Sequence, residues 1–78
     1  MITGAQIRHA RALLRWGPQQ LAERARVSVR TIARAESTEG EPLITTTHSV
    51  ALQRALEEAG IEFTNGAEPG VKLKRHSE

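Results

Sequence analysis

Residues 18–36 decide the fold, and they read Pro-Gln-Gln-Leu-Ala-Glu-Arg-Ala-Arg-Val-Ser-Val-Arg-Thr-Ile-Ala-Arg-Ala-Glu. Pro18 suits the first position of a helix, because the N–H that proline lacks would have no partner there. A short apolar stripe follows at helical spacing. Ser28 is a good N-cap for the next helix. The stretch therefore predicts a helix over about 18–25, a tight turn, and a second helix over about 29–36.

A longer helix is expected on each side of this pair. Before it, Thr3 and Gln6 have the spacing of a capping box, so a helix is predicted over about 4–15. After it, apolar residues recur at helical spacing over about 47–59, and Gly60 is placed for the left-handed residue that ends a helix. Short helices with tight connections indicate a compact all-α fold.

The sequence that follows the fourth helix changes to the alternation of apolar and polar residues that is typical of strands. A β-hairpin is predicted over 61–74, because turn-forming residues separate two alternating runs, at Asn65-Gly66 and Pro69-Gly70. A two-stranded hairpin is marginal in water by itself, so it must pack on the helices or pair with another chain. The expected parts are a helical domain over 1–60, a hairpin extension over 61–74 and a disordered tail over 75–78.

Composition limits the function classes. The chain has 78 residues, which is enough for one small domain. It has no cysteine and no aspartate, which excludes disulfides, thiolate zinc sites and Ser-His-Asp triads. Its three histidines are isolated and it has no glycine-rich phosphate loop, so we expect no enzyme activity, cofactor, metal ion or small-molecule ligand. The sequence has neither a long apolar run nor an apolar leader segment, and a cytoplasmic location is expected.

Charge is divided unevenly along the chain. Residues 1–36 carry seven arginines and two glutamates, a net charge of +5, whereas residues 37–70 carry one arginine and six glutamates, a net charge of −5. Arginine suits phosphates and guanine edges, so the basic first part favours nucleic-acid binding, with an ordinary solvated helix face as the alternative. One tryptophan and one phenylalanine are too few for readout of single strands by aromatic stacking.

Together with Arg11, residues 18–36 resemble the Cro/repressor-type (XRE) family of helix-turn-helix DNA-binding domains. The family pattern reads approximately R-x-x-x-G-[LW]-S-Q-x-x-L-A-x-x-A-G-V-S-x-x-T-I-x-x-x-E-x-G, and the match is most specific from Leu21 to Glu36. The likeness covers about residues 5–60, and the chain resembles the short single-domain members from proteobacteria. It implies a four- to five-helix, lambda-repressor-like fold, a recognition helix in the major groove of double-stranded DNA, and a mobile-element context.

The resemblance assigns the reading of bases to the helix over 29–36. Family members read base edges from the start of this helix and from one turn later, and here those positions are Val29, Arg30 and Arg34. Two arginines four residues apart share one helix face. Arginine makes a bidentate contact to guanine and valine can meet a thymine methyl, so the expected site contains G·C pairs.

Other positions of the family pattern imply supporting roles. Family members commonly pair an arginine of the first helix with a glutamate that closes the third, and Arg11 and Glu36 hold these positions as a structural ion pair. The threonines before the fourth helix, Thr45, Thr46 and Thr47, are expected to provide its cap, with contact to DNA as the alternative. The expected phosphate contacts are Gln19, Arg15, Arg26 and Thr31, with burial against the turn as the alternative for Thr31.

Three departures from the family pattern concern DNA binding. Arg15 and Arg26 stand where the family usually has glycine, and Gly17-Pro18 replaces the usual Ser-Gln, whose glutamine commonly contacts DNA. A left-handed residue is expected at Arg26, where a side chain costs about 1 kcal/mol. Either extra arginine–phosphate contacts offset these losses, or DNA binding is degraded and the chain is a protein-binding module.

These expectations give two function hypotheses. The first is a sequence-specific transcriptional regulator that binds double-stranded DNA as a homodimer on an inverted-repeat operator. The second is a protein-binding module, antiactivator or antitoxin-like, built on a helix-turn-helix scaffold. The hairpin is the candidate dimer element, through Phe63, Val71 and Leu73. The alternative is that these three side chains only cover the helical core.

Overall fold

The computed structural model describes residues 2–64 and 70–74. Within these residues the predicted helices and hairpin are confirmed, each helix within one residue of its expected bounds. Most of the expected turn and the expected tail, residues 65–69 and 75–78, lie outside the described part. The elements are α1 (Gly4–Leu14), α2 (Pro18–Ala25), α3 (Val29–Ala35), α4 (Thr46–Glu58), β1 (Ile61–Thr64) and β2 (Gly70–Leu73).

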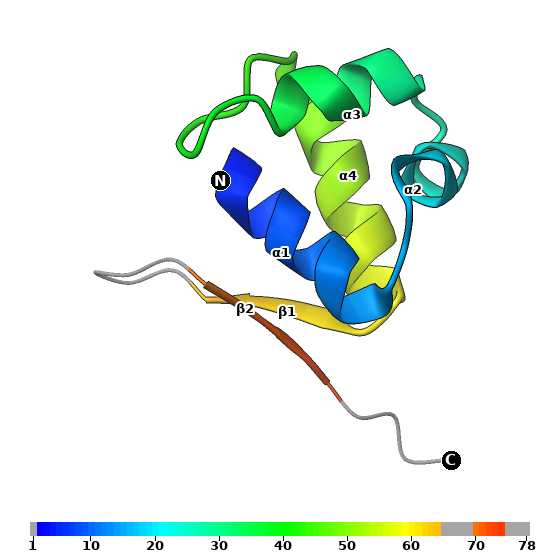
Figure 1. Ribbon diagram of the computed structural model, residues 1–78, viewed down its shortest axis with the longest axis vertical. Coiled ribbons are helices and arrows are strands. Elements are labelled where there is room, and N and C mark those ends of the chain that lie inside the picture. Colours follow the sequence, from blue (N-terminus) through cyan, green and yellow to red (C-terminus); the bar gives the residue numbers. More distant parts are fainter. Residues whose placement is uncertain (1, 65–69, 75–78) are drawn as a thin grey trace.

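The helices lie on one side of the hairpin (Figure 1). α1 and α4 form the middle of the molecule, with α3 and the N-terminal end of α4 at one end and the hairpin at the other. α2 packs against both α3 and α4. No helix in the described residues is long and apolar enough to cross a membrane. The arrangement leaves α3 as the element farthest from the sheet.

Each helix begins where a side chain or backbone group caps it. The predicted capping box of α1 is present, because Thr3 accepts from the N–H of Gln6 and the Gln6 side chain accepts from the N–H of Thr3. The Ser28 hydroxyl caps α3, as expected. Among the three candidate threonines, Thr45 caps α4, because α4 begins one residue earlier than expected.

Two helices end at arginines with left-handed backbone. Arg15 follows α1 with φ 58° and Arg26 follows α2 with φ 59°. Gly60 follows the C-cap of α4 with φ 107°, where a glycine was expected to end the helix. A non-glycine residue in this conformation is strained by about 1–2 kcal/mol, so the two arginines store strain at the ends of the helices that flank the Gly17-Pro18 turn.

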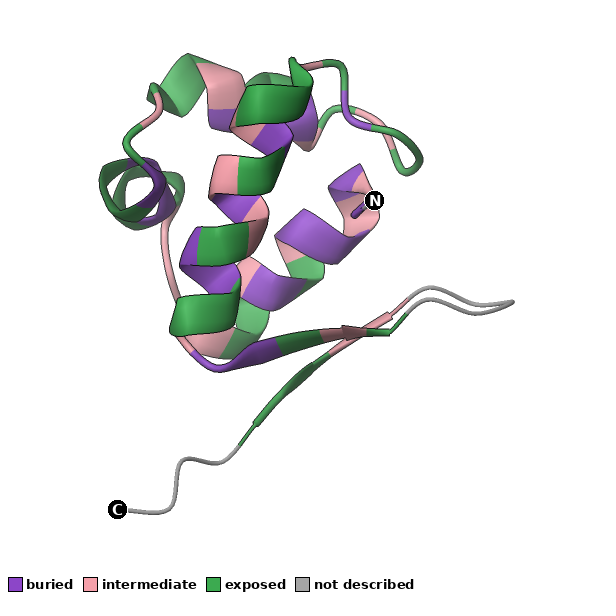
Figure 2. Cartoon of the chain, turned by 180° about the vertical axis from the view of Figure 1, so that it is seen from behind, coloured by how far each residue is buried: buried purple, intermediate pink, exposed green. Residues whose placement is uncertain are grey.

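The core is aliphatic and small. Figure 2 shows the buried positions on the helix sides that face the middle of the molecule. Trp16 is only half-buried, and the Arg24 guanidinium lies over its ring at 5.0 Å. The tryptophan therefore covers the core rather than filling it. The buried apolar residues are Ile2, Ile7, Ala10, Leu21, Ala22, Ala25, Ile32, Ala35, Leu52, Ala55, Leu56 and Ile61.

The hairpin packs through one face and is held by a glutamine. β1 and β2 are antiparallel, with Ile61 opposite Leu73 and Phe63 opposite Val71 on the face toward the helices. The opposite face is polar. Gln6, which is buried, donates its side-chain amide to the carbonyl oxygens of Thr64 and Gly70. Of the two expected arrangements, packing on the helices is therefore observed, and pairing with another chain stays a prediction.

Candidate nucleic-acid interface

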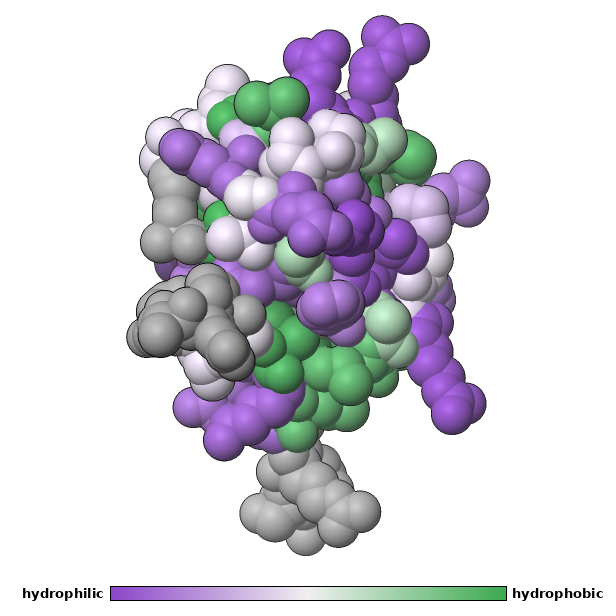
Figure 3. Space-filling model, turned by 60° about the vertical axis from the view of Figure 1, so that its left-hand side comes forward, coloured by the Kyte–Doolittle hydropathy of each residue, from purple (hydrophilic) through white to green (hydrophobic). Residues whose placement is uncertain are grey.

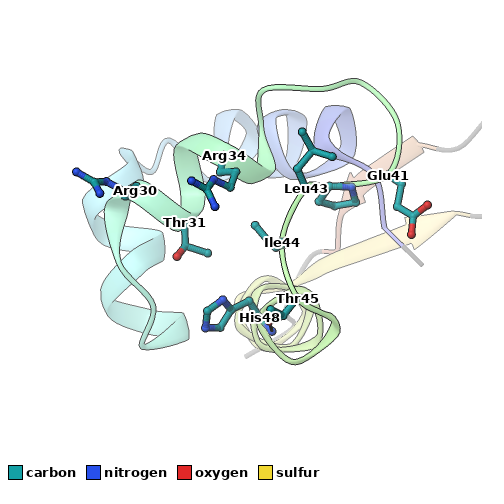
Figure 4. Close-up of a pocket in the computed structure, with 9 residues that line it drawn as sticks. Arg30, Thr31, Arg34, Glu41, Leu43, Ile44, Thr45 and His48 are labelled. Atoms are coloured by element: carbon teal, nitrogen blue, oxygen red, sulfur yellow. Dashed lines mark hydrogen bonds between the residues drawn. The ribbon is translucent and has the colours of Figure 1, made fainter.

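An open hollow lies between α3, the segment that follows it and the start of α4 (Figure 4). Its volume is about 870 Å³. Arg30 and Arg34 project from α3 at its edge, and His48 projects from the first turn of α4. The hollow therefore joins two helices at the end of the molecule remote from the hairpin. Its lining residues are Arg30, Thr31, Arg34, Glu41, Pro42, Leu43, Ile44, Thr45 and His48.

α3 divides into an inner and an outer face. Ile32 and Ala35 are buried, which fixes the helix on the core. Arg30 and Arg34 are exposed on the outer side, four residues apart, and Val29 at the helix start is exposed as well. All three expected base-reading residues are thus open to a ligand.

The arginines of α3 carry positive charge that no acidic side chain of the described residues neutralises in an ion pair. Within residues 2–64 and 70–74, neither Arg30 nor Arg34 forms an ion pair. Glu41 is the acidic residue among those that line the hollow, and it is exposed. The guanidinium groups therefore keep their N–H donors for an anionic or hydrogen-bonding ligand.

An ion pair between α1 and the residue that ends α3 fixes the position of α3. Arg11 donates to both carboxylate oxygens of Glu36, from Nε at 2.8 Å and from a terminal nitrogen at 2.9 Å. Another terminal nitrogen donates to the carbonyl oxygen of Trp16 at 3.0 Å. Hydrogen bonding to Glu36 raises the pKa of Arg11 despite partial burial. The predicted pair is therefore present, with 22% and 11% of the two side chains exposed.

The expected phosphate-contacting residues do not gather in one place. Thr31 lines the hollow and is half-buried, and its hydroxyl lies 3.0 Å from that of Ser28 at the helix cap. Gln19 is exposed in the first turn of α2, and Arg26 is exposed in the turn before α3. Arg15 follows the last residue of α1. Of these four, the structure brings only Thr31 together with Arg30 and Arg34.

Sequence reasoning missed several residues of the hollow. His48 was treated as an isolated histidine, yet it stands in the first turn of α4 and faces the hollow. Leu43 is 62% exposed and lines the same hollow with Glu41. The segment between α3 and α4 has no apolar periodicity, so no sequence signal could place it. The helix expected over about 47–59 already places His48 in its first turn, and this is the one available clue to its position.

The three candidate dimer residues divide into two groups. Phe63 and Val71 are partly buried and pack against the helical core, as the alternative interpretation expected. Leu73 is 46% exposed. Packing within one chain therefore explains two of these side chains and leaves Leu73 without a complete covering.

Comparison with known proteins gives no relative: no family model, no curated protein and no solved structure matches the chain. A role for the hollow and for α3 has to be argued from their residues, charges and geometry.

Proposed function

We propose that the protein is a sequence-specific, double-stranded DNA-binding regulator of the Cro/repressor type, with α3 as the recognition helix in the major groove. One observation carries the proposal: Arg30 and Arg34 are exposed on the outer side of α3, without an ion pair in the described residues. Two free guanidinium groups on one helix face suit the acceptor pairs of guanine.

The surroundings of α3 support contacts to the DNA backbone. Phosphate contacts position a protein on the duplex, whereas base contacts specify the sequence. His48 and the capped start of α4 lie across the hollow from the arginines, where a strand that flanks the groove could pass. The exposed residues Gln19 and Arg26 are not among those that line the hollow, and they stand at the start of α2 and in the turn before α3. Groups that could contact the DNA backbone are thus available at the hollow and in the helix and turn that precede the recognition helix.

The left-handed conformation of Arg15 and Arg26 bears on whether the departures from the family pattern weaken DNA binding or are offset by extra contacts with phosphate. Each position accepts an arginine at a cost in strain, and each presents an exposed guanidinium. For Arg26, in the turn before α3, this favours the interpretation in which arginine replaces glycine to add a contact with phosphate. Arg15 follows the end of α1 that lies beside the hairpin, away from the proposed recognition helix. A single module of this size gives weak specificity, so we also propose a homodimer on an inverted repeat.

Selection from a randomised duplex library at about 150 mM salt tests the proposal. We expect a palindromic motif with G·C pairs. Arg34→Ala should relax the preference at one base pair by about 1–3 kcal/mol. Arg54→Ala is the matched control, because it removes the same charge from an exposed position in the second half of α4. Recovery of no motif, with weak binding that Arg34→Ala and Arg54→Ala reduce equally, would overturn the proposal.

A protein-binding module is the second candidate, and Leu43 is the observation that favours it. This leucine is 62% exposed beside Glu41 in the hollow, and an exposed leucine next to an acidic group suits a protein surface better than a phosphate backbone. Under this candidate, loss of Arg30 and Arg34 leaves function intact while Leu43→Ser abolishes it. The library selection with both sets of variants separates the two candidates.

A further inference from the structure

The outer edge of β2 has backbone groups that no other part of the described chain pairs with. Lys74 donates its N–H to the carbonyl oxygen of Gly60, which makes these two residues a hydrogen-bonded pair of the ladder. Hydrogen-bonded and non-hydrogen-bonded pairs alternate along antiparallel strands, so Glu62 and Lys72 form the next hydrogen-bonded pair. Val71 and Leu73 lie in the non-hydrogen-bonded pairs, and they therefore direct their N–H and C=O groups away from β1. No described residue bonds to this outer edge.

An apolar surface lies beside this edge. Leu13 lies seven residues after Gln6, on the same face of α1, and Gln6 is bonded to Gly70 at the start of β2. Leu13 is 44% exposed and Leu73 is 46% exposed. Figure 3 shows apolar surface gathered in the half of the molecule that carries the hairpin. The open edge and the exposed leucines thus belong to one surface.

We propose that a second copy of this chain covers this surface, by antiparallel pairing of β2 with β2 of the partner. The proposal rests on the DNA-binding function, because such a dimer supplies the two recognition helices that an inverted repeat needs. Val71 of each copy would lie opposite Leu73 of the other copy. The outward N–H and C=O groups of the two strands would then form hydrogen bonds with one another. The result is a four-stranded sheet with the leucine surfaces of both copies adjacent. An isologous contact of this kind is closed and self-complementary.

The polar face of the hairpin is compatible with this pairing. Lys72 would lie opposite Lys72 of the second copy, which is unfavourable by itself. Each Lys72 already has Glu62 of its own hairpin at 3.8 Å. The row across four strands therefore contains two positive and two negative charges, and the Lys72 pair limits the strength of the contact. Removal of this like-charge pair should tighten the dimer.

The symmetry of the contact is right for a duplex. Two antiparallel neighbours in one sheet are related by a two-fold axis perpendicular to the sheet. The four helices lie on one side of the hairpin, with α3 farthest from it (Figure 1). Rotation about this axis therefore keeps both α3 helices on the same side of the dimer. Two recognition helices on one side are what an inverted repeat requires.

Sedimentation equilibrium of the full chain without DNA tests the interface. We expect a mass twice 8.6 kDa that falls toward the monomer on dilution. Leu73→Arg and, independently, Leu13→Arg should weaken the dimer by at least about tenfold, because each places a charge beside the pairing edge. Val50→Arg is the control, because this residue is exposed on α4 and lies outside the proposed contact. Lys72→Thr should tighten the dimer.

Circular dichroism of each variant establishes that the fold is retained. A wild-type protein that stays monomeric, or a dimer that tolerates both arginine variants, overturns the interface. The library selection reports separately on DNA binding. A monomer that still selects a motif would refute only the interface, whereas a β2-paired dimer that selects none would refute only the DNA-binding function.

Discussion

Gln6 donates a side-chain N–H to the carbonyl oxygen of Gly70 at 2.9 Å, which bonds the first turn of α1 to the start of β2, 64 residues further along the chain. The same amide nitrogen donates to the carbonyl oxygen of Thr64 at 3.2 Å. Its oxygen accepts from the N–H of Thr3 at 2.8 Å. One buried side chain therefore joins the helix cap to both strands.

Gln6→Leu should lower the free energy of unfolding by about 2–3 kcal/mol, because it removes three hydrogen bonds to partly buried backbone groups while keeping the side-chain volume. Chemical denaturation measures the loss. Gln53→Leu is the matched control. Within the described residues its amide bonds only to the side chain of Glu57, in an exposed position, so its effect should stay within about 0.5 kcal/mol. Equal losses in the two variants would contradict a special role for Gln6.

Gly4→Ala should destabilise the protein by about 2 kcal/mol or more, although alanine is the better helix former. A Cβ at this position would clash with the carbonyl oxygens of Ala35 and Thr38, at the end of α3 and just after it. Backbone atoms cannot move aside as a flexible side chain can. Gly17→Ala has nothing near its added Cβ and should cost less than about 1 kcal/mol. Thermal melts of the two variants check the difference, and similar melting temperatures would refute it.

Ser49→Ala should stabilise the protein by about 1 kcal/mol. The Ser49 hydroxyl is buried in α4 without a hydrogen-bond partner among residues 2–64 and 70–74, and alanine removes this cost while improving helix propensity. The same substitution at Ser28 should have the opposite sign, with a loss of about 1 kcal/mol, because that hydroxyl caps α3. Urea titration of both variants provides the test, and a loss at Ser49 would show that its hydroxyl has a partner in solution.

Arg26→Gly should raise stability by about 0.5–1 kcal/mol, because glycine adopts the left-handed conformation without strain. If Arg26 contacts a phosphate as proposed, the variant should also reduce the slope of log K against log salt by about one. Arg24→Gly, two residues earlier, should instead lose about 1 kcal/mol, because Arg24 lies within α2 and over Trp16. Unfolding and duplex-binding titrations of both proteins separate strain from contact. An unchanged slope for Arg26→Gly would remove Arg26 from the phosphate contacts.

Local signals predicted most of the fold. The caps at Thr3 and Ser28 and the breaks at Gly17-Pro18 and Gly60 act within a few residues, so the bounds of the helices follow from neighbouring positions. The pair Arg11 and Glu36 was predicted only through the family resemblance, because nothing in a single sequence links residues 25 positions apart.

Contacts between distant segments escaped prediction. The sequence identified Gln6 as a capping residue, and that role used its oxygen, but its nitrogen bonds to strands that could not be positioned beforehand. The same limit applies to His48 and Leu43. Both reach the hollow through the path of an irregular segment, which depends on tertiary packing rather than on periodicity.

The guanidinium of Arg11 binds Trp16 and Glu36, the two residues that bracket α2 and α3. One side chain of α1 therefore bonds to the chain both just before α2 and just after α3. The two ends of this helix pair are held at the same guanidinium. The pair cannot tilt away from α1 without losing three charge-assisted hydrogen bonds. A ligand that binds α3 thus meets a preorganised surface, and little of the binding free energy is spent on ordering it.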